Sequence, residues 1–243
     1  MPRRVTTVVV VLLGWLSPAQ GTGQGPAAVE DGGVVTVSLG AADGGAIDAD
    51  VYGRGPRGVV LLHGGRFDRT SWRPQAQVLA SAGFRVIAID FRAAVETRAG
   101  RETSCLYDAV CLARDARAAV RYLRATGATS VGIVGASLGG GAAAEAAIEA
   151  PGEVDRVVLL AHMTIDRPER LRVPALFIVA RDDANAGGPR LPAIRAQYEK
   201  AVGPKELVVL DGEAHAQFLF ATTQGDALLQ RILRFLDAAP TGR

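Results

Sequence analysis

Net charge is nearly absent from this sequence. Its 27 basic and 25 acidic residues leave a formal charge of +2, and Arg3 and Arg4 at the N-terminus account for all of it. A neutral body has no electrostatic attraction for nucleic acid or for an anionic membrane surface, so we expect neither as a partner. Lysine occurs only at Lys200 and Lys205, so a single arginine carries little weight as a functional signal.

An apolar run of membrane-spanning length is also missing from the N-terminal region. After the two arginines, residues 5–16 are apolar apart from two threonines and one glycine, and the small residues Ser17 and Ala19 follow. This order is typical of a secretory signal peptide, here residues 1–19. As a helix the apolar core would span about 18 Å, less than the roughly 30 Å of a bilayer. We therefore expect a secreted or periplasmic protein with no stable membrane span after cleavage; an N-terminal membrane anchor is the alternative.

Only two cysteines are present, and none lies in the first hundred residues, which argues against a lipid-anchored lipoprotein. Cys105 and Cys111 would lie about 9 Å apart along one helix, beyond the roughly 7 Å limit for a disulfide. They can bridge only if Cys105 lies in a loop before the helix that carries Cys111, and residues 98–104 resemble such a loop. Export favours the bridge over the alternative of two free thiols. Neither cysteine has a histidine near it in sequence, so no metal site is expected.

The apolar pattern distinguishes half-exposed from buried strands. Two segments alternate apolar and polar residues, as in an antiparallel edge: residues 34–39 and 46–52. Six continuous apolar runs are typical of parallel strands covered on both faces: residues 59–63, 84–90, 130–135, 156–161, 175–180 and 206–210. Five helices are predicted between and after them: residues 72–82, 108–125, 138–150, 191–202 and 225–238.

This order of elements predicts an α/β fold with a mostly parallel, doubly wound sheet and an antiparallel N-terminal edge. We find no internal repeat and no second domain, so residues 34–243 form one domain after a flexible, glycine-rich leader at residues 20–33. Only thirteen residues separate the strand ending at Ala161 from the strand starting at Ala175, too few for a helical cap domain.

A serine stands where the third buried strand runs into a helix. Residues 135–139 read Gly-Ala-Ser-Leu-Gly, and glycines permit a sharp strand-to-helix turn that exposes the hydroxyl of Ser137. The bare motif is a weak signal in a chain with 29 glycines, so its place between strand and helix carries the argument. A phosphate-binding loop is the rival interpretation, but no Gly-Lys-Ser or Gly-Lys-Thr follows. We expect Ser137 to be a nucleophile and the N–H of Leu138 to stabilise an oxyanion.

A serine hydroxyl needs a base to take its proton, and the chain has three histidines. His215 follows the last predicted strand, on a loop at the strand's C-terminal end, where open α/β sheets form their active sites. His63 precedes two glycines that suit a loop supplying backbone N–H groups. For His63 and His162 we favour a structural role, although His162 could line the pocket.

An acid must hold the imidazole in the correct tautomer. Asp182 and Asp183 follow the strand at residues 175–180, and the chain order of serine, Asp183 and His215 matches that of known hydrolases. Asp166, after the preceding strand, is the alternative acid.

On these motifs the chain resembles the α/β-hydrolase superfamily, and within it small, capless members similar to dienelactone hydrolases and esterases. Leu-Leu-His-Gly-Gly at residues 61–65 matches the family's oxyanion loop, which implies an oxyanion donor at Gly65, with Arg66 as the alternative. The segment at residues 177–183 resembles the family's strand and acid, and it places the acid at Asp183. Gly-Glu-Ala-His at residues 212–215 resembles the family's final Gly-x-x-His.

The sequence also departs from the family pattern. Dienelactone hydrolases carry cysteine at the position of Ser137, which argues against that substrate. Ala216 follows the final histidine where many relatives have glycine. At residues 93–95 the chain has Ala-Ala-Val where relatives commonly have a Gly-x-Gly turn. This departure affects the expected shape of the pocket wall and leaves the assignment of Ser137, Asp183 and His215 unchanged.

Together these features predict a serine hydrolase that cleaves a carboxylic ester or similar acyl bond of a small molecule through an acyl-enzyme, without a cofactor. The pocket is expected to include Trp72, Met163 and Phe218. A peptidase or thioesterase on the same fold is one alternative, and a non-catalytic binding protein of this fold is another. The sequence sets no expectation for the oligomeric state.

Overall fold

The structure is a computed structural model that describes residues 29–31, 33–41, 45–101, 105 and 107–238. The predicted signal peptide and most of the predicted leader lie outside these residues. The last part of that leader was wrongly predicted as flexible, because Val29–Asp31 forms a strand, β1, that pairs with the next strand. Three residues are too few for an apolar pattern, so only the partner strand reveals this one.

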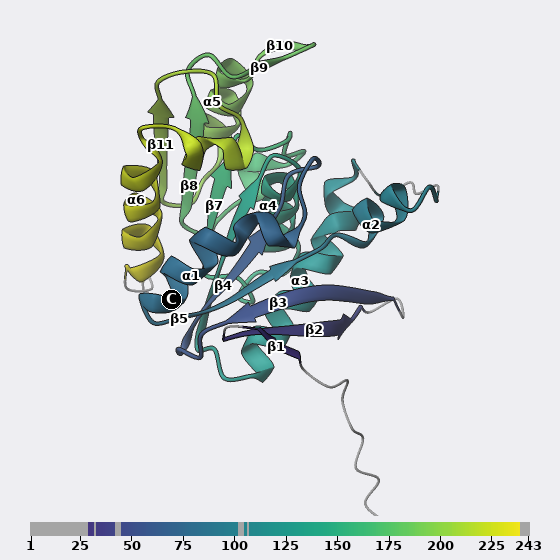
Figure 1. The fold of residues 1–243 in the computed structure, drawn as a ribbon. Helices are drawn as coiled ribbons and strands as arrows, with labels where there is room; N and C mark the ends of the chain where they lie inside the picture. Colours follow the sequence, from purple (N-terminus) through teal and green to yellow (C-terminus); the bar gives the residue numbers. More distant parts are fainter. Residues whose placement is uncertain (1–28, 32, 42–44, 102–104, 106, 239–243) are drawn as a thin grey trace, which may run out of the picture.

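Nine strands form one sheet (Figure 1). In spatial order they are β1, β2 (Val34–Gly40), β3 (Ala46–Tyr52), β5 (Phe84–Ile89), β4 (Arg57–Leu62), β6 (Ser130–Ala136), β7 (Arg156–Leu160), β8 (Ala175–Ala180) and β11 (Lys205–Leu210). The strands from β5 to β11 in this order are parallel, while β1, β2 and β3 are antiparallel to their neighbours. The predicted parallel sheet with an antiparallel N-terminal edge is confirmed. A separate hairpin joins β9 (Ala184–Asn185) and β10 (Gly188–Pro189).

The five predicted helices are present, with ends that differ by at most two residues: α1 (Arg73–Ser81), α3 (Ala109–Ala125), α4 (Leu138–Glu149), α5 (Arg190–Lys200) and α6 (Gly225–Asp237). A sixth, α2 (Arg92–Arg98), was not predicted and includes residues 93–95. The N–H of Arg92 at its start donates to the carboxylate of Asp115 in α3. Local sequence cannot show this distant contact, which is why the helix was missed. None of the helices in the described part of the chain combines the length and hydropathy that crossing a bilayer requires.

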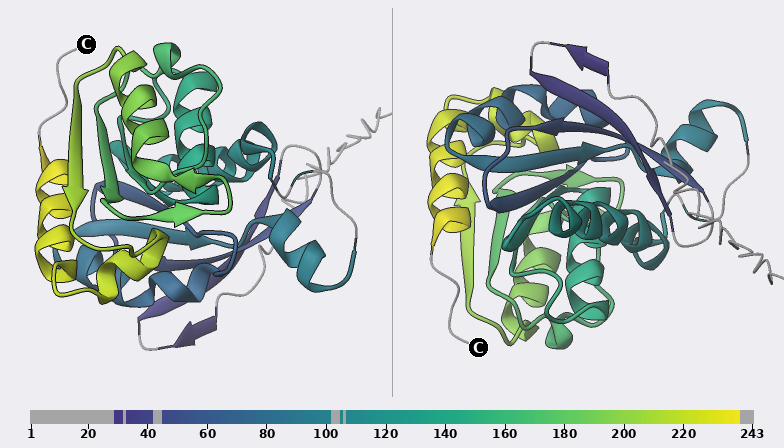
Figure 2. Two further views of the ribbon diagram at one scale, coloured as in Figure 1. Left: turned by 90° about the horizontal axis from the view of Figure 1, so that it is seen from above. Right: turned by 90° about the horizontal axis from the view of Figure 1, so that it is seen from below.

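Helices cover both faces of the sheet (Figure 2). Helices α3, α4 and α5 pack on one face, and α1 and α6 pack on the other. The strands between these layers are shielded on both sides, which is why they read as continuous apolar runs. The fourteen residues between β7 and β8 contain only one turn of 3₁₀ helix, Pro168–Arg170, so no cap domain lies there.

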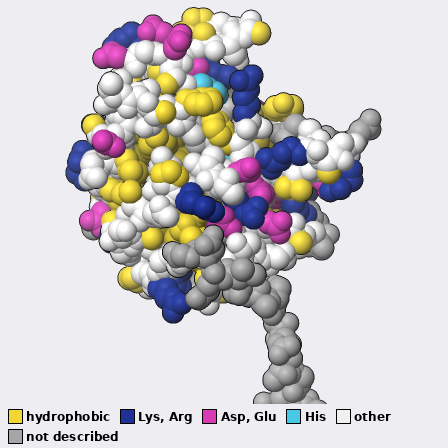
Figure 3. Space-filling model, viewed as in Figure 1, with side chains coloured by type: hydrophobic (Ala, Val, Ile, Leu, Met, Phe, Trp, Pro, Cys, Tyr) yellow, Lys and Arg dark blue, Asp and Glu magenta, His cyan; other side chains and the backbone are white. Residues whose placement is uncertain are grey.

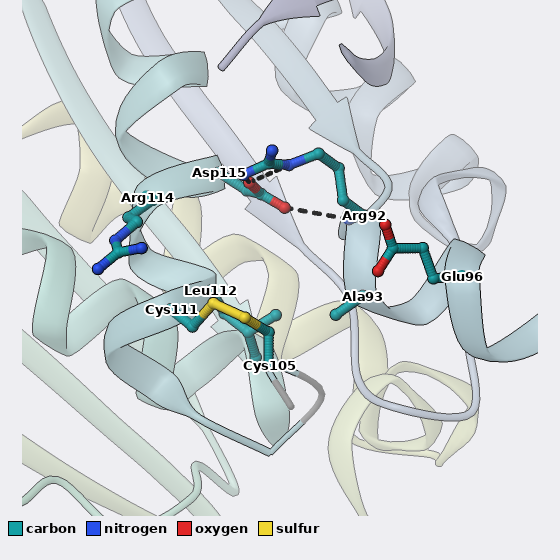
Figure 4. Close-up of a pocket in the computed structure, with 8 residues that line it drawn as sticks. All are labelled: Arg92, Ala93, Glu96, Cys105, Cys111, Leu112, Arg114 and Asp115. Atoms are coloured by element: carbon teal, nitrogen blue, oxygen red, sulfur yellow. Dashed lines mark hydrogen bonds and ion pairs between the residues drawn. A yellow bond between two sulfur atoms is a disulfide. The ribbon is translucent and has the colours of Figure 1, made fainter. Parts of the chain in front are cut away.

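A disulfide joins Cys105 and Cys111, as predicted. Cys105 lies before α3 and Cys111 lies in its first turn, with the two Cα atoms 5.5 Å apart. The carboxylate of Asp108 accepts from the N–H groups of Val110 and Cys111 and so caps this helix. Figure 4 shows the bridge beside Ala93, at a small pocket between α2 and α3. The bridge therefore fastens the incoming chain to the start of the helix.

Reduction of this disulfide should lower the free energy of unfolding by roughly 2 kcal/mol, because the bridge closes a short loop and restricts the unfolded chain. Thermal unfolding of the purified protein with and without a phosphine reductant measures the change. The variant Cys105→Ser/Cys111→Ser should already have the lower melting temperature and should not respond to the reductant. An unchanged melting temperature in wild-type protein that mass spectrometry shows to be fully reduced would contradict the expectation.

Candidate active site

Ser137 lies in the sharp turn between β6 and α4. Its backbone has φ 50° and ψ −110°, a conformation that a residue with a Cβ rarely adopts. Backbone hydrogen bonds to neighbouring segments hold it there. Its N–H donates to the carbonyl of Leu160 at 2.8 Å, and its carbonyl accepts from Gly140 at 3.0 Å and from Met163 at 2.9 Å. Because the neighbouring strand and helix determine this conformation together, the turn can keep the serine in its strained geometry.

The glycines that flank Ser137 are required by close backbone contacts. A Cβ on Gly135 would lie 2.1 Å from the carbonyl oxygen of Gly139. A Cβ on Gly139 would lie 2.4 Å from the carbonyl oxygen of Leu62 in β4. No side chain fits at either position, so helix α4 can begin directly against the ends of β4 and β6 only because both residues are glycine.

Ser137, His215 and Asp183 meet at the C-terminal edge of the parallel strands. Nε2 of His215 lies 2.9 Å from Oγ of Ser137, and Nδ1 of His215 lies 2.7 Å from Oδ2 of Asp183. The three residues follow β6, β11 and β8, so strands distant along the chain bring them together. In the neutral imidazole that matches these contacts, Nδ1–H donates to the carboxylate and Nε2 accepts the serine hydroxyl.

The carboxylate of Asp183 is buried, while the His215 side chain is 30% exposed. Histidine atoms reach the surface in Figure 3, beside apolar side chains and basic groups. Of the chain's three histidines, His63 and His162 are buried and His215 is not. A buried acid therefore stands behind a partly accessible imidazole, and Ser137 is itself half-buried.

The two other acids considered from the sequence lie elsewhere. Asp182 is exposed, and its backbone N–H donates to the carbonyl of Gly212 at 2.9 Å. Asp166 is also exposed, and no hydrogen bond within the described residues joins it to His215. Burial raises the pKa of Glu145, and the negative charge of Asp166 adds to that rise. Asp183 itself faces a cation that the sequence did not suggest, since Nε of Arg190 lies 3.3 Å from its Oδ1.

The loop after β4 presents the candidate oxyanion donor Gly65. The preceding carbonyl, of Gly64, contacts Nδ1 of His63 at 2.8 Å and accepts from the N–H of Phe67 at 3.0 Å. Burial lowers the pKa of His63, so its ring is neutral near pH 7, and its Nε2 accepts from the N–H of Phe91. Within the described residues, neither Gly65 nor Leu138 donates its backbone N–H to another protein group.

Two of the four predicted pocket residues belong to the core instead. Trp72 is fully buried and lies edge-to-face with Phe220. His162 is buried against Phe177, behind α4. Neither offers surface to a substrate, so these predictions are wrong. The sequence could not separate them from pocket residues, because aromatic rings serve both purposes equally well.

The other two predicted pocket residues stay near the candidate nucleophile. Met163 is half-buried and donates its N–H to Ser137. Phe218 is 51% exposed, follows His215 by three residues and lies edge-to-face with Phe67 of the Gly65 loop. Phe67 carried no signal in the sequence. In the part of the chain that the structure describes, no group of three or more histidine, cysteine or acidic residues could hold a metal ion.

Comparisons with known proteins identify the fold family. The family model described as alpha/beta hydrolase fold matches residues 58–204, more than half of the chain. No curated protein matches the sequence significantly. Among solved structures, a dienelactone hydrolase from Anabaena variabilis is 26% identical with a TM-score of 0.67, covering 82% of this chain and 94% of that chain.

Two further solved structures share the fold at lower identity. The esterase Pf2001 from Pyrococcus furiosus is 19% identical with a TM-score of 0.67, and the match covers 83% of this chain and 90% of that chain. A bromoperoxidase from Bacillus anthracis is 17% identical with a TM-score of 0.62, and the match covers 84% of this chain and 100% of that chain. At these identities the likeness concerns the fold alone.

Proposed function

We propose that this chain, which belongs to the α/β-hydrolase fold family, cleaves carboxylic esters or similar acyl bonds of small molecules with Ser137 as nucleophile. It is a hydrolase of the esterase and dienelactone-hydrolase type. The observation that carries the proposal is the continuous hydrogen-bond chain from the Ser137 hydroxyl through His215 to the buried carboxylate of Asp183. A hydroxyl, an imidazole and a carboxylate in this order are what acyl transfer to serine requires.

In the first half of the reaction, Oγ of Ser137 attacks the substrate carbonyl while Nε2 of His215 takes the hydroxyl proton. The imidazolium that forms is stabilised by Asp183, which stays ionised. The backbone N–H groups of Gly65 and Leu138 donate to the developing oxyanion. When the tetrahedral intermediate collapses, His215 gives its proton to the leaving oxygen, and an acyl-enzyme remains.

In the second half, water replaces the alcohol. His215 takes a proton from the water, which attacks the acyl carbon, and the same two amides hold the second oxyanion. Collapse of this intermediate returns the proton to Oγ of Ser137 and releases the acid. The absence of a cap between β7 and β8 favours an open site, and the exposed ring of Phe218 offers apolar surface beside it.

We also propose that the mature protein works outside the cytoplasm. The disulfide between Cys105 and Cys111 supports this, since such bonds persist in oxidising compartments. The predicted signal peptide at residues 1–19 would deliver it there, and an N-terminal membrane anchor stays the alternative. Mass spectrometry of the protein recovered from the producing cell, with an N-terminus near Gln20 expected, tests the proposal.

Labelling with a fluorophosphonate probe tests the proposed function directly. The probe phosphonylates an activated serine, so the wild-type protein should be labelled at Ser137 and the Ser137→Ala variant should not. A panel of p-nitrophenyl acyl esters, thioesters and peptide amides then ranks the acyl bonds that are cleaved. A folded wild-type protein that takes no label and cleaves no member of the panel would support a binding protein instead.

Asp183→Asn should lower kcat on p-nitrophenyl acetate by about ten-thousand-fold, because the amide holds the wrong tautomer of the imidazole. Asp166→Asn is the matched control, since it makes the same change at an exposed carboxylate and should keep kcat within about twofold. Steady-state kinetics on both variants measure the difference. Loss of activity in Asp166→Asn, with Asp183→Asn active, would reverse the assignment of the acid.

A further inference from the structure

The side chain of Gln217 is buried between the loop of the candidate base and the loop of the candidate oxyanion donor. Its Oε1 accepts from the N–H of Gly64 at 3.2 Å, and its Nε2 donates to Oγ of Ser71 at 3.0 Å. The residue is 8% exposed. Gln217 therefore joins three segments that are distant along the chain, and no motif in the sequence indicated it.

The orientation of the Gln217 amide is fixed by its partners. The hydroxyl of Ser71 donates its single proton to the carbonyl of Asp68, at 2.6 Å. Oγ of Ser71 can therefore only accept from Gln217, which turns Nε2 toward the serine and Oε1 toward the N–H of Gly64. Only a neutral side chain of this length that both donates and accepts satisfies the two contacts.

The backbone around Gln217 directs the side chain toward Gly64, beside the candidate nucleophile. Ala216 has φ 56°, so the chain turns sharply between His215 and Gln217. A Cβ placed on Gly64 would lie 3.2 Å from Oε1 of Gln217 and 3.5 Å from Cβ of Ser137. Gly64 thus lies close to both the glutamine and the nucleophile, one residue before the amide of Gly65.

We propose that Gln217 is a positioning residue for catalysis, because it holds the Gly64–Gly65 backbone at a fixed distance from His215 and Ser137. The inference rests on the proposed function. His63 and Phe67 bind the Gly64 carbonyl, while Gln217 binds its N–H, so the peptide groups on both sides of Gly64 are restrained. Without Gln217 the Gly65 amide would still be present, but it would be placed less accurately against the oxyanion.

The variant Gln217→Met keeps the length of the side chain and removes both hydrogen bonds. We expect kcat/KM on p-nitrophenyl acetate to fall about 30-fold, mainly through kcat, since a small misplacement of a catalytic group has effects of this order. Affinity for a trifluoromethyl ketone should fall by the same factor. This inhibitor forms a bond from Oγ of Ser137 to its carbonyl carbon, with the proton passing to His215 and the oxyanion resting on the loop amides.

Ser71→Ala removes the contact that orients the glutamine amide, together with the hydroxyl's bond to the carbonyl of Asp68, but leaves the bond from Gly64 to Gln217, so a smaller loss of about threefold is expected. Gln230→Met makes the same chemical change at an exposed residue of α6 and should match wild type in both measurements. A folded Gln217→Met variant with kcat/KM within twofold of wild type would overturn the inference. So would a fall in kcat with unchanged affinity for the ketone.

If Gln217→Met does not fold, Ser71→Ala decides, and wild-type kinetics there would count against the inference. Failure of the proposed function gives a different result. In that case the wild-type protein and Ser137→Ala would behave alike, with no ester hydrolysis that depends on the serine. Failure of the inference alone leaves hydrolysis that depends on Ser137 but is indifferent to Gln217 and Ser71.

Discussion

Ser137→Ala should leave a folded protein whose kcat on p-nitrophenyl acetate has fallen by about five orders of magnitude. Loss of a nucleophile that acts together with its base removes nearly all the rate that the group provides, leaving what substrate binding and the oxyanion amides supply. The substitution deletes one oxygen atom on a half-buried side chain, so the melting temperature should change by only a few degrees. Steady-state kinetics and thermal unfolding of the same preparation measure both quantities.

The matched control is Ser130→Ala, the same deletion at the other end of β6. Ser130 begins the strand that Ser137 follows, and it should keep wild-type kinetics. His215→Ala should lose about as much activity as Ser137→Ala, and the double variant should lose little more, because the two groups act as one unit. Full activity in Ser137→Ala, or additive losses in the double variant, would contradict the proposed reaction.

The parts of the fold that the sequence predicted share one physical basis. Strands buried on both faces need continuous apolar runs, and helices that cover them need an apolar face, so both leave periodic patterns. The turn at Ser137 was predictable for a related reason. Backbone contacts at Gly135 and Gly139 leave no room for a side chain, so both positions require glycine, and a glycine is visible in the sequence.

Features that depend on contacts between distant segments left no such pattern. Helix α2 begins where Asp115 of α3 accepts from Arg92, and β1 exists because β2 lies beside it. Gln217 and Arg190 reach the candidate site through side-chain geometry that composition and spacing do not encode. Trp72 was wrongly predicted to line the pocket because its residue type is common both in pockets and in the core.

His162 is the clearest case of a side chain whose chemistry only the structure reveals. Its ring is buried against Phe177, and a Cβ on Gly140 would lie 2.6 Å from the Cβ of His162, so α4 packs directly against it. Within the described residues neither ring nitrogen makes a well-aligned hydrogen bond. Burial lowers the pKa of His162 from 6.5 to about 4, and the side chain of Gln197 offsets part of that effect.

The low pKa of His162 predicts a loss of stability in acid. The unfolded chain binds the proton near pH 6.5, whereas the folded chain resists it down to about pH 4, so protons favour unfolding between these values. Above pH 6.5 the ring of His162 is neutral in both the folded and the unfolded chain and costs no stability. As the pH falls from 6.5 to about 4, the free energy of unfolding decreases, because only the unfolded chain takes up the proton. The free energy of unfolding should therefore drop by about 2–3 kcal/mol between pH 7.5 and pH 4.5 on account of His162 alone.

Urea unfolding of wild type and His162→Phe at the two pH values isolates this contribution. The phenyl ring keeps the edge-to-face contact with Phe177 but cannot take a proton, and every other titrating group, including the buried His63, is common to both proteins. The drop in the free energy of unfolding should be smaller in the variant by about 2–3 kcal/mol. An equal drop in both proteins would mean that His162 is not protonated on unfolding in this range. The acid sensitivity would then come from other groups, with His63 first among them, because burial lowers its pKa in the same direction.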